Sequence, residues 1–309
     1  MKILFTGPTG VLGHTAVPRL VAAGHEVTGA VRPDTDAEWL RTVGVEPVSV
    51  DLFDAGAVRE AAAGHDAIVH YATSIPSRAD FAKRRAWEGN DRLRTDATKN
   101  LVDAALAADV EVFVQQSISF VYADGGERWL DEDAEVAPVW DVLESALDAE
   151  REVAGFTAGG GRGVALRMGR LYGPGSASAG YLDGVAARSI PIVGSGEAFV
   201  SHLHSEDAGA ATVAALEAAP AGIYNVSDGN PVRAAHDLAL VAELLGAAAP
   251  RRIPFAAARL AVGQAARMLA VSQRVAVDRF RAATGWLPVY SSVEDGWRQV
   301  IAERFATAS

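Results

Sequence analysis

The chain has 309 residues, half of them hydrophobic, and a formal net charge of −11, so we expect one large globular domain or one and a half, without nucleic acid or an anionic membrane as a general partner. Without cysteine there are no disulfides and no thiolate chemistry, and the seven histidines lack ligand spacing, so we predict no metal site. No apolar run reaches the roughly 18 to 20 residues of a membrane helix and no signal peptide precedes the first strand, so we expect a cytoplasmic protein, monomeric or homodimeric.

Apolar, strand-like runs alternate with segments of helical periodicity in the first half of the chain. The runs lie at residues 3–5, 27–31, 47–50, 67–71, 112–116 and 164–168, and the helical periodicity is clear at 16–23 and 93–108. This alternation is typical of parallel strands joined by helical crossovers. We therefore predict an α/β fold, a Rossmann-type doubly wound parallel sheet.

A glycine-rich turn follows the first strand and opens a helix. Gly7, Gly10 and Gly13 supply the unusual backbone angles, the close approach of a pyrophosphate and the tight helix packing that a dinucleotide site requires. The helix N-terminus adds free N–H groups and a positive dipole end. The turn predicts a dinucleotide site, and the alternative is an ordinary tight turn.

Beyond about residue 172 the alternation weakens, and turn clusters at 172–175, 194–196 and 228–231 surround shorter elements. We predict a smaller, mixed C-terminal lobe there. The expected division is a dinucleotide-binding Rossmann domain at residues 1–171, completed by parts of 200–230, and a substrate-binding lobe at residues 172–309.

Together these landmarks make the chain similar to the extended short-chain dehydrogenase/reductase superfamily, the group of sugar-nucleotide epimerases, dehydratases and dihydroflavonol-type reductases. The matching segments run nearly end to end in family order: the glycine turn, Asp51-Leu52, His70-Tyr71-Ala72, residues 167–174, 204–207, 224–226 and 285–288. The resemblance implies an oxidoreductase that uses a nicotinamide cofactor.

The end of the second strand indicates which nicotinamide cofactor binds. NAD enzymes usually place an acid there for the ribose 2′-hydroxyl, but here Arg32 follows an apolar residue. Because arginine pairs with a 2′-phosphate and stacks on adenine, we expect NADP(H). The alternative is a solvated Arg32, with Asp34 or Asp36 reaching the ribose.

The resemblance also implies which residues contact the cofactor. Asp51 and Leu52 would hold the adenine, and Tyr71, Ala72 and Thr73 would line the path to the nicotinamide. The remaining expected contacts are Gly7, Thr9, Gly10, Val11, Leu12, Met168, Arg170 and Leu171.

The usual catalytic residues of this superfamily are missing. In the family a tyrosine, its pKa lowered by a lysine one helical turn later, exchanges a proton with the substrate while a serine or threonine orients the carbonyl. Here Val142 stands at the tyrosine position and Ala146 at the lysine position of a helix expected around residues 144–150. Ile118 replaces the serine, and Arg94 stands where asparagine is common.

Hydride transfer can proceed without these groups. A positioned general acid contributes about 10²–10⁴ in rate, whereas orientation against the nicotinamide can contribute roughly 7 to 11 kcal/mol. Ser117 and Ser119 face the same side of the strand-to-loop segment, and we take them as candidate catalytic hydroxyls that stabilise a developing alkoxide. The alternatives are a substrate hydroxyl, a bound water, or serines that only satisfy loop backbone groups.

Other polar and aromatic residues have competing interpretations. We expect Tyr122 to pack under the loop and His204 to be structural, each with a catalytic alternative. Arg170 lies in the nicotinamide-side loop or pairs with an acid. Trp129 and Trp140 are either an aromatic wall for a planar substrate or ordinary packing.

No arginine lies in residues 194–204, where epimerases and dehydratases commonly clamp a nucleotide diphosphate, so the lobe suits a neutral, hydrophobic substrate. Our first hypothesis is an NAD(P)H-dependent ketoreductase without the tyrosine and lysine. It would act on a hydrophobic polycyclic or aromatic ketone and resemble those that tailor polyketide antibiotics. The second is a non-enzymatic NADP(H)-binding redox sensor, and the third is a sugar-nucleotide epimerase or dehydratase.

Overall fold

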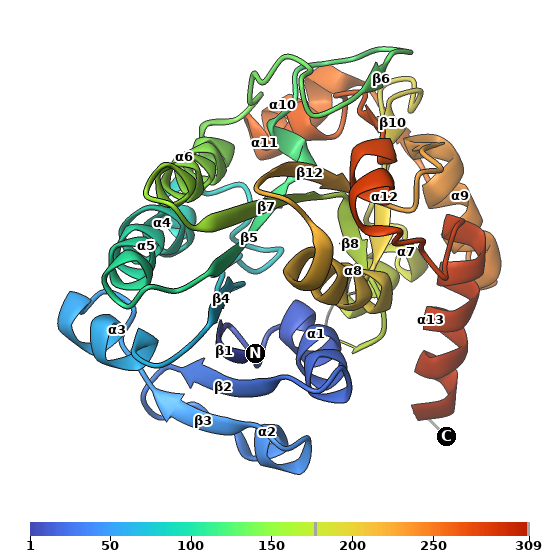
Figure 1. The fold of residues 1–309 in the computed structure, drawn as a ribbon. Helices are drawn as coiled ribbons and strands as arrows, with labels where there is room; N and C mark the ends of the chain where they lie inside the picture. Colours follow the sequence, from blue (N-terminus) through green and yellow to red (C-terminus); the bar gives the residue numbers. More distant parts are fainter. Residues whose placement is uncertain (176–177, 308–309) are drawn as a thin grey trace.

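The computed structural model describes residues 1–175 and 178–307 and is built on a seven-stranded parallel sheet (Figure 1). The strand order is β12-β7-β5-β4-β1-β2-β3. The strands are β1 (Lys2–Thr6), β2 (Glu26–Val31), β3 (Glu46–Ser49), β4 (Ala67–His70), β5 (Val112–Ile118), β7 (Arg162–Met168) and β12 (Gly222–Val226). All six predicted strands are present, and the α/β, Rossmann-type doubly wound prediction is confirmed.

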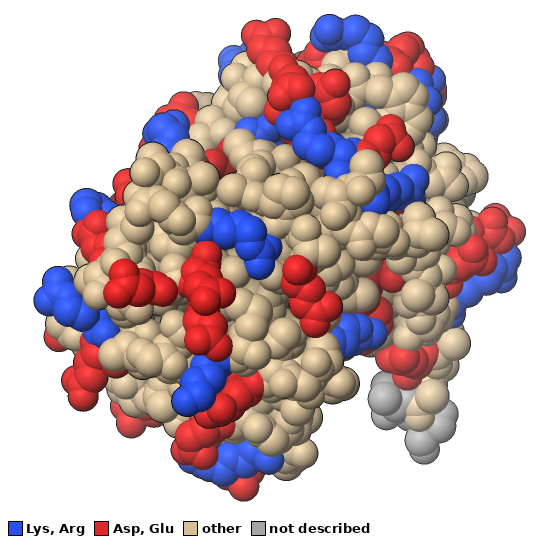
Figure 2. Space-filling view, in the orientation of Figure 1, with Lys and Arg blue, Asp and Glu red and all other residues tan. Residues whose placement is uncertain are grey.

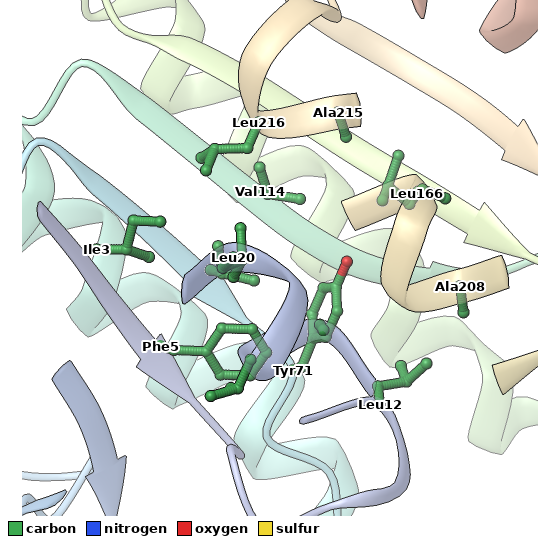
Figure 3. Packing of buried hydrophobic residues seen from close by; sticks show 14 of the residues in the cluster. Ile3, Phe5, Leu12, Leu20, Tyr71, Val114, Leu166, Ala208, Ala215 and Leu216 are labelled. Carbon is green, nitrogen blue, oxygen red and sulfur yellow. The ribbon is translucent and has the colours of Figure 1, made fainter. Parts of the chain in front are cut away.

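Helices cover both faces of the sheet. On one face lie α1 (Val11–Ala22), α2 (Glu38–Thr42) and α8 (Ser205–Ala218), and on the other α3 (Ala55–Ala62), α5 (Thr98–Ala107) and α6 (Glu144–Ala158). Successive strand residues point to opposite faces. Ile3 and Phe5 therefore pack toward α1 and α8 (Figure 3). Leu4 packs toward α3 and α5 on the other face. Burying each such side chain contributes about 1.5–3 kcal/mol, and the sheet is held from both sides.

The segment predicted as one helix at 93–108 is interrupted. The helix α4 (Glu88–Arg92) leads into a π-helical turn, η2 (Leu93–Ala97), and only then into α5. The apolar spacing of this segment predicted a continuous helix and did not reveal the π turn. The turn changes which side the intervening side chains face.

The C-terminal part forms a smaller mixed layer, as predicted. Its core contains Tyr172 and Trp297 together with apolar side chains of α7 (Ala179–Ala186), α9 (Ala234–Leu244) and α13 (Val293–Thr307). Two short strand pairs join an earlier segment to this part: β8 (Arg170–Tyr172) with β11 (His202–His204), and β6 (Trp129–Leu130) with β15 (Arg274–Val275). Two more lie within this part: β9 (Ile192–Val193) with β14 (Arg252–Ile253), and β10 (Phe199–Val200) with β13 (Val232–Arg233). The seventh sheet strand, β12, lies beyond residue 172, and the domain division at that residue stays a prediction.

The remaining short elements are η1 (Arg84–Trp87), η3 (Ser119–Val121), η4 (Asp141–Leu143), α10 (Phe255–Val262), α11 (Ala265–Met268) and α12 (Asp278–Thr284). On the face drawn in Figure 2, acidic and basic side chains are interspersed. Within the described ranges, no helix is both long and apolar enough to cross a membrane.

Candidate active site

The turn between β1 and α1 is shaped by glycines that no other residue can replace. Gly7 has a φ of +74°, and a Cβ added there would lie 2.7 Å from the backbone N and Cα of Ala72 at the end of β4. A Cβ on Gly13 would collide with the Pro8 carbonyl. The first N–H groups of α1 have no partner inside the helix, and Gly10 at its N-cap offers no side chain to satisfy them. This backbone fits a pyrophosphate.

Tyr71 is one of the residues expected along the path toward the nicotinamide, but its side chain points into the core. Tyr71 is 4% exposed, its hydroxyl lies 2.7 Å from the Thr212 hydroxyl on α8, and its ring packs beside Phe5 in the core (Figure 3). Leu12 is likewise buried. Ala72 is half-buried and Thr73 exposed directly after this point, opposite Gly7.

The residues expected around the adenosine lie at the carboxyl ends of β2 and β3. Arg32 is exposed just after β2. Asp51, also exposed, follows β3, the strand paired with β2, and its Oδ1 accepts a hydrogen bond from the Phe53 N–H at 2.9 Å. The Leu52 carbonyl accepts from Asn100 Nδ2 at 3.0 Å. Both loops therefore open at the same edge of the sheet.

Ser117 belongs to a buried ionic network at the end of β5. It is 0% exposed, and its hydroxyl donates to Glu150 Oε1 at 2.6 Å. Arg167 on β7 donates to both oxygens of Glu150, at 2.9 and 2.7 Å. Although burial alone would lower the pKa of Arg167, the Glu150 hydrogen bonds and charge raise it, so Arg167 stays cationic. The Ser117 hydrogen is committed to Glu150, which ties β5, α6 and β7 together.

The network continues through Tyr122. Its hydroxyl donates to Asn225 Oδ1 at 2.8 Å, its ring lies 4.9 Å from the Arg167 guanidinium carbon, and it is 0% exposed. Burial raises the pKa of Tyr122. The Asn225 N–H donates to Glu132 Oε1 at 2.8 Å. Tyr122 therefore packs beneath the loop as expected and is a structural residue.

Buried apolar residues occupy the positions of the family's tyrosine and lysine. Val142 in η4 and Ala146 on α6 are both 0% exposed. Val142 packs in a cluster that we call the aromatic cluster, built around Phe81, Trp87 and Trp140, whose ring centroids lie 5.0 to 5.7 Å apart. Leu143 and Ala265 complete its buried part, and its half-buried margin consists of Ile118, Phe120, Val139, Val262 and Met268.

Ser119 lies next to this cluster. It is 2% exposed, in the short turn η3, and both of its neighbours, Ile118 and Phe120, pack at the margin of the aromatic cluster. Unlike Ser117, it is not part of the Glu150 network. Of the two candidate serines, Ser119 therefore remains a candidate.

Trp129 and Trp140 do not form a common aromatic wall, and for Trp140 the ordinary-packing alternative holds. Trp140 is buried against Trp87, at 5.5 Å between ring centroids, whereas Trp129 is 50% exposed and stacks with the Arg274 guanidinium at 4.5 Å. Trp129 lines a separate cavity of about 310 Å³ with Asp131, Glu132, Ala276, Asp278 and Arg279. Trp87 was missed because it lies some fifty residues before Trp140, and only tertiary packing joins them.

His204 and Arg170 have structural partners. His204 caps α8, since its Nδ1 accepts from the Glu206 N–H at 3.2 Å, and its Nε2 lies 3.1 Å from Gln299 Oε1. Burial lowers the pKa of His204. Arg170 Nη1 lies 3.9 Å from Asp237 Oδ2, which agrees with the alternative that Arg170 pairs with an acid. Met168 is 1% exposed, whereas Leu171 is half-buried in β8.

The fold and the glycine turn define a Rossmann-type dinucleotide-binding protein, and comparison with known proteins agrees. The model of the NAD dependent epimerase/dehydratase family matches residues 3–227, so the chain belongs to this family. It is an NAD(P)-dependent oxidoreductase. This confirms the superfamily resemblance and the prediction of an enzyme.

Two curated relatives are reductases. The chain is 37% identical, over 96% of its length and 99% of the relative's, to 3-diazoavenalumate denitrifying reductase of Streptomyces sp. It is 27% identical, over 84% of its length and 78% of the relative's, to 4-hydroxy-2-methyl-3-oxo-4-farnesyl-3,4-dihydroquinoline-1-oxide ketoreductase of Stigmatella aurantiaca.

Solved structures share the fold. DesIV, a dTDP-glucose 4,6-dehydratase from Streptomyces venezuelae with bound NAD, aligns with a TM-score of 0.83 at 20% identity, covering 99% of this chain and 97% of that one. Human epimerase family protein SDR39U1 with NADPH aligns with a TM-score of 0.76 at 23% identity, covering 98% and 99%.

Proposed function

We propose that the protein is an NAD(P)H-dependent reductase that directs hydride onto a hydrophobic aromatic substrate without a side-chain proton donor. The observation that carries this proposal is the pair Val142 and Ala146, both fully buried in place of the family's tyrosine and lysine. The aromatic cluster beside them suits a planar, apolar substrate better than a sugar nucleotide.

The first candidate substrate is an aromatic diazo compound. A bound nicotinamide supplies one hydride. When an arenediazonium carbon accepts it, the C–N bond breaks, a C–H bond forms and N₂ leaves with the electron pair of the broken bond. The balance is Ar–N₂⁺ plus NADPH giving Ar–H, N₂ and NADP⁺, with no proton consumed. A site without the proton-transferring tyrosine fits this reaction, and the full-length relative named a denitrifying reductase supports it.

The second candidate substrate is a ketone on a polycyclic or aromatic, polyketide-like skeleton. Hydride addition to a carbonyl leaves an alkoxide, which must then take up a proton. We assign the stabilisation of that oxygen to the Ser119 hydroxyl in η3, with water as the final proton source. The ketoreductase relative favours this candidate. The redox-sensor and epimerase hypotheses rank below both.

Within either reaction the chain's own residues bind, orient and exclude water. The glycine turn receives the pyrophosphate, and the Glu150–Arg167 pair fixes the end of β5 and helix α6. The aromatic cluster keeps water away from the reacting carbon, which strengthens electrostatic interactions in the site. The exposed Arg32 favours NADPH over NADH by pairing with a 2′-phosphate.

The test is turnover with matched substrates. Purified protein is mixed with NADPH and either an ortho-diazophenol bearing an apolar side chain or the corresponding aryl ketone. NADPH consumption is followed together with N₂ release and product identity. One N₂ and one arene per NADPH supports the first candidate, and an alcohol supports the second. Tight NADPH binding without turnover of either substrate contradicts the proposal.

A further inference from the structure

Arg94 is a buried cation, and two of its side-chain nitrogens lack hydrogen-bond acceptors. Its side chain belongs to a residue that is 3% exposed, and within the described part of the chain neither Nε nor Nη1 has a hydrogen-bond partner. Buried donors in native proteins are nearly always satisfied, so such an exception points to strain, to an unplaced water or to a ligand. None of the ion pairs in the described ranges involves Arg94.

Arg94 belongs to the π turn η2, which is anchored near the carboxyl edge of the sheet. π turns are rare and occur frequently at functional sites. The Leu93 carbonyl accepts a hydrogen bond from His70 Nε2 at 3.1 Å, and His70 Nδ1 accepts from the Thr6 hydroxyl at 2.6 Å. Because Thr6 and His70 are the last residues of β1 and β4, this chain of bonds anchors the turn beside Gly7.

Two acids influence Arg94, and both have other partners. Glu150 is held by Ser117 and by both donors of Arg167. Asp91 pairs with Arg84 at 2.7 Å through Oδ2, and its Oδ1 is buried without a partner. Burial lowers the pKa of Arg94 to about 10, against the raising effect of Asp91 and Glu150, so the group stays cationic at neutral pH. In the part of the chain that the structure describes, no acid forms an ion pair with the Arg94 guanidinium.

The turn also packs on α6, the helix that carries Ala146 one turn before Glu150. The buried Arg94 side chain thus lies on a turn that packs against α6, and it is near enough to Glu150 on that helix to be influenced by its charge. We propose that Arg94 binds an oxygen of the ligand at the reacting end of the site. The oxygen belongs either to a ribose hydroxyl of the nicotinamide nucleotide or to an ionised group of the substrate, a phenolate or carboxylate. This inference rests on the proposed function.

The experiment compares Arg94→Met and Arg94→Lys with the wild-type chain. Lys99→Met is the matched control, because Lys99 lies on α5 directly after the π turn, is exposed, and removes the same charge. NADPH affinity is measured by fluorescence titration. KM and kcat are measured with the diazophenol and with the same compound after its acidic groups are methylated.

We expect Arg94→Met to lose about 10-fold or more in one binding step, Arg94→Lys to recover part of the loss because it keeps the charge without the planar fork, and Lys99→Met to change nothing. Loss of NADPH affinity identifies the ribose. Unchanged NADPH affinity with a raised KM for the anionic substrate, but not for the methylated one, identifies the substrate oxygen.

A purely structural arginine predicts a different pattern. If Arg94 only held the fold, Arg94→Met would lower the thermal midpoint while NADPH affinity and both KM values stayed at wild-type values, and the inference would be overturned. If instead Arg94 binds a ligand, it has no acceptor for these donors in the free protein. Arg94→Met then leaves the thermal midpoint unchanged or raises it. Absence of wild-type turnover contradicts the proposed function alone, because the NADPH titration still tests the ribose contact. If that titration is also unchanged, the inference fails.

Discussion

The turn after β1 and the segment from Ser117 to Ala146 lie at the same edge of the sheet but have diverged to different degrees. The turn keeps every glycine that close approach requires, and Gly7 faces Ala72 with no room for a side chain. The second segment keeps its strand and helix, which the Glu150–Arg167 ion pair just beyond it supports, but has apolar residues where protons would be exchanged. This difference is what the proposed hydride delivery without a side-chain proton donor requires.

The largest effect is expected from Glu150→Gln, which removes the carboxylate that binds Ser117 and Arg167. Arg167 would be left buried without its counter-charge, and removing one partner of such a pair costs about 3–5 kcal/mol. Chemical denaturation should show this loss. Glu144→Gln, in the exposed first turn of the same helix, is the control and should change stability by less than about 0.5 kcal/mol. Equal effects of the two variants would show that the pair does not support the site.

Gly7→Ala should nearly abolish cofactor binding. The positive φ costs about 1–3 kcal/mol for alanine, and the new Cβ would also collide with the Ala72 backbone, so NADPH affinity should fall by about 100-fold or more. Gly24→Ala is the matched control, because Gly24 also has a positive φ, +87°, but nothing lies within 4 Å of its Cβ position. Calorimetric titration of both variants separates strain from close approach. Wild-type affinity in Gly7→Ala would remove the turn from the cofactor site.

Arg32→Ala should change the choice of cofactor. If Arg32 pairs with the 2′-phosphate, KM for NADPH should rise by about 10-fold while KM for NADH stays constant, since a hydrogen bond to a charged group contributes about 1.5–3 kcal/mol. Arg41→Ala, an exposed arginine on α2, is the control. A parallel rise for both cofactors, or no rise, would exclude the phosphate contact.

With the first candidate substrate, the diazo compound, Ser119→Ala has the smallest expected effect, and this variant distinguishes the two candidate substrates. With a diazo substrate no alkoxide forms, so kcat should change by less than about 2-fold. With a ketone, loss of an oxyanion donor costs about 10²–10³ in kcat. Ser117→Ala serves as a comparison, because its hydroxyl is bound to Glu150 and its loss should lower stability instead of kcat. An unchanged kcat with the ketone would remove Ser119 from the reaction.

The sequence predicted the sheet and the catalytic departures because both depend on local patterns. Apolar runs reveal buried parallel strands, and the spacing within residues 142–150 identifies Val142 and Ala146. It did not reveal that Trp87 packs on Trp140, since that contact joins separate segments. It also did not reveal the burial of Arg94, because a π turn leaves no clear periodicity signal. Contacts made by Tyr71 and Ser117 likewise depended on tertiary packing.

The most direct test of hydride delivery without a proton donor uses NADPH carrying deuterium at both C4 positions, with the diazophenol in ordinary water. We predict one deuterium on the ring carbon that carried nitrogen and one N₂ per NADPH, in the wild-type chain and in Ser119→Ala alike. An arene containing only hydrogen from water, or N₂ release that does not depend on NADPH, would contradict the account.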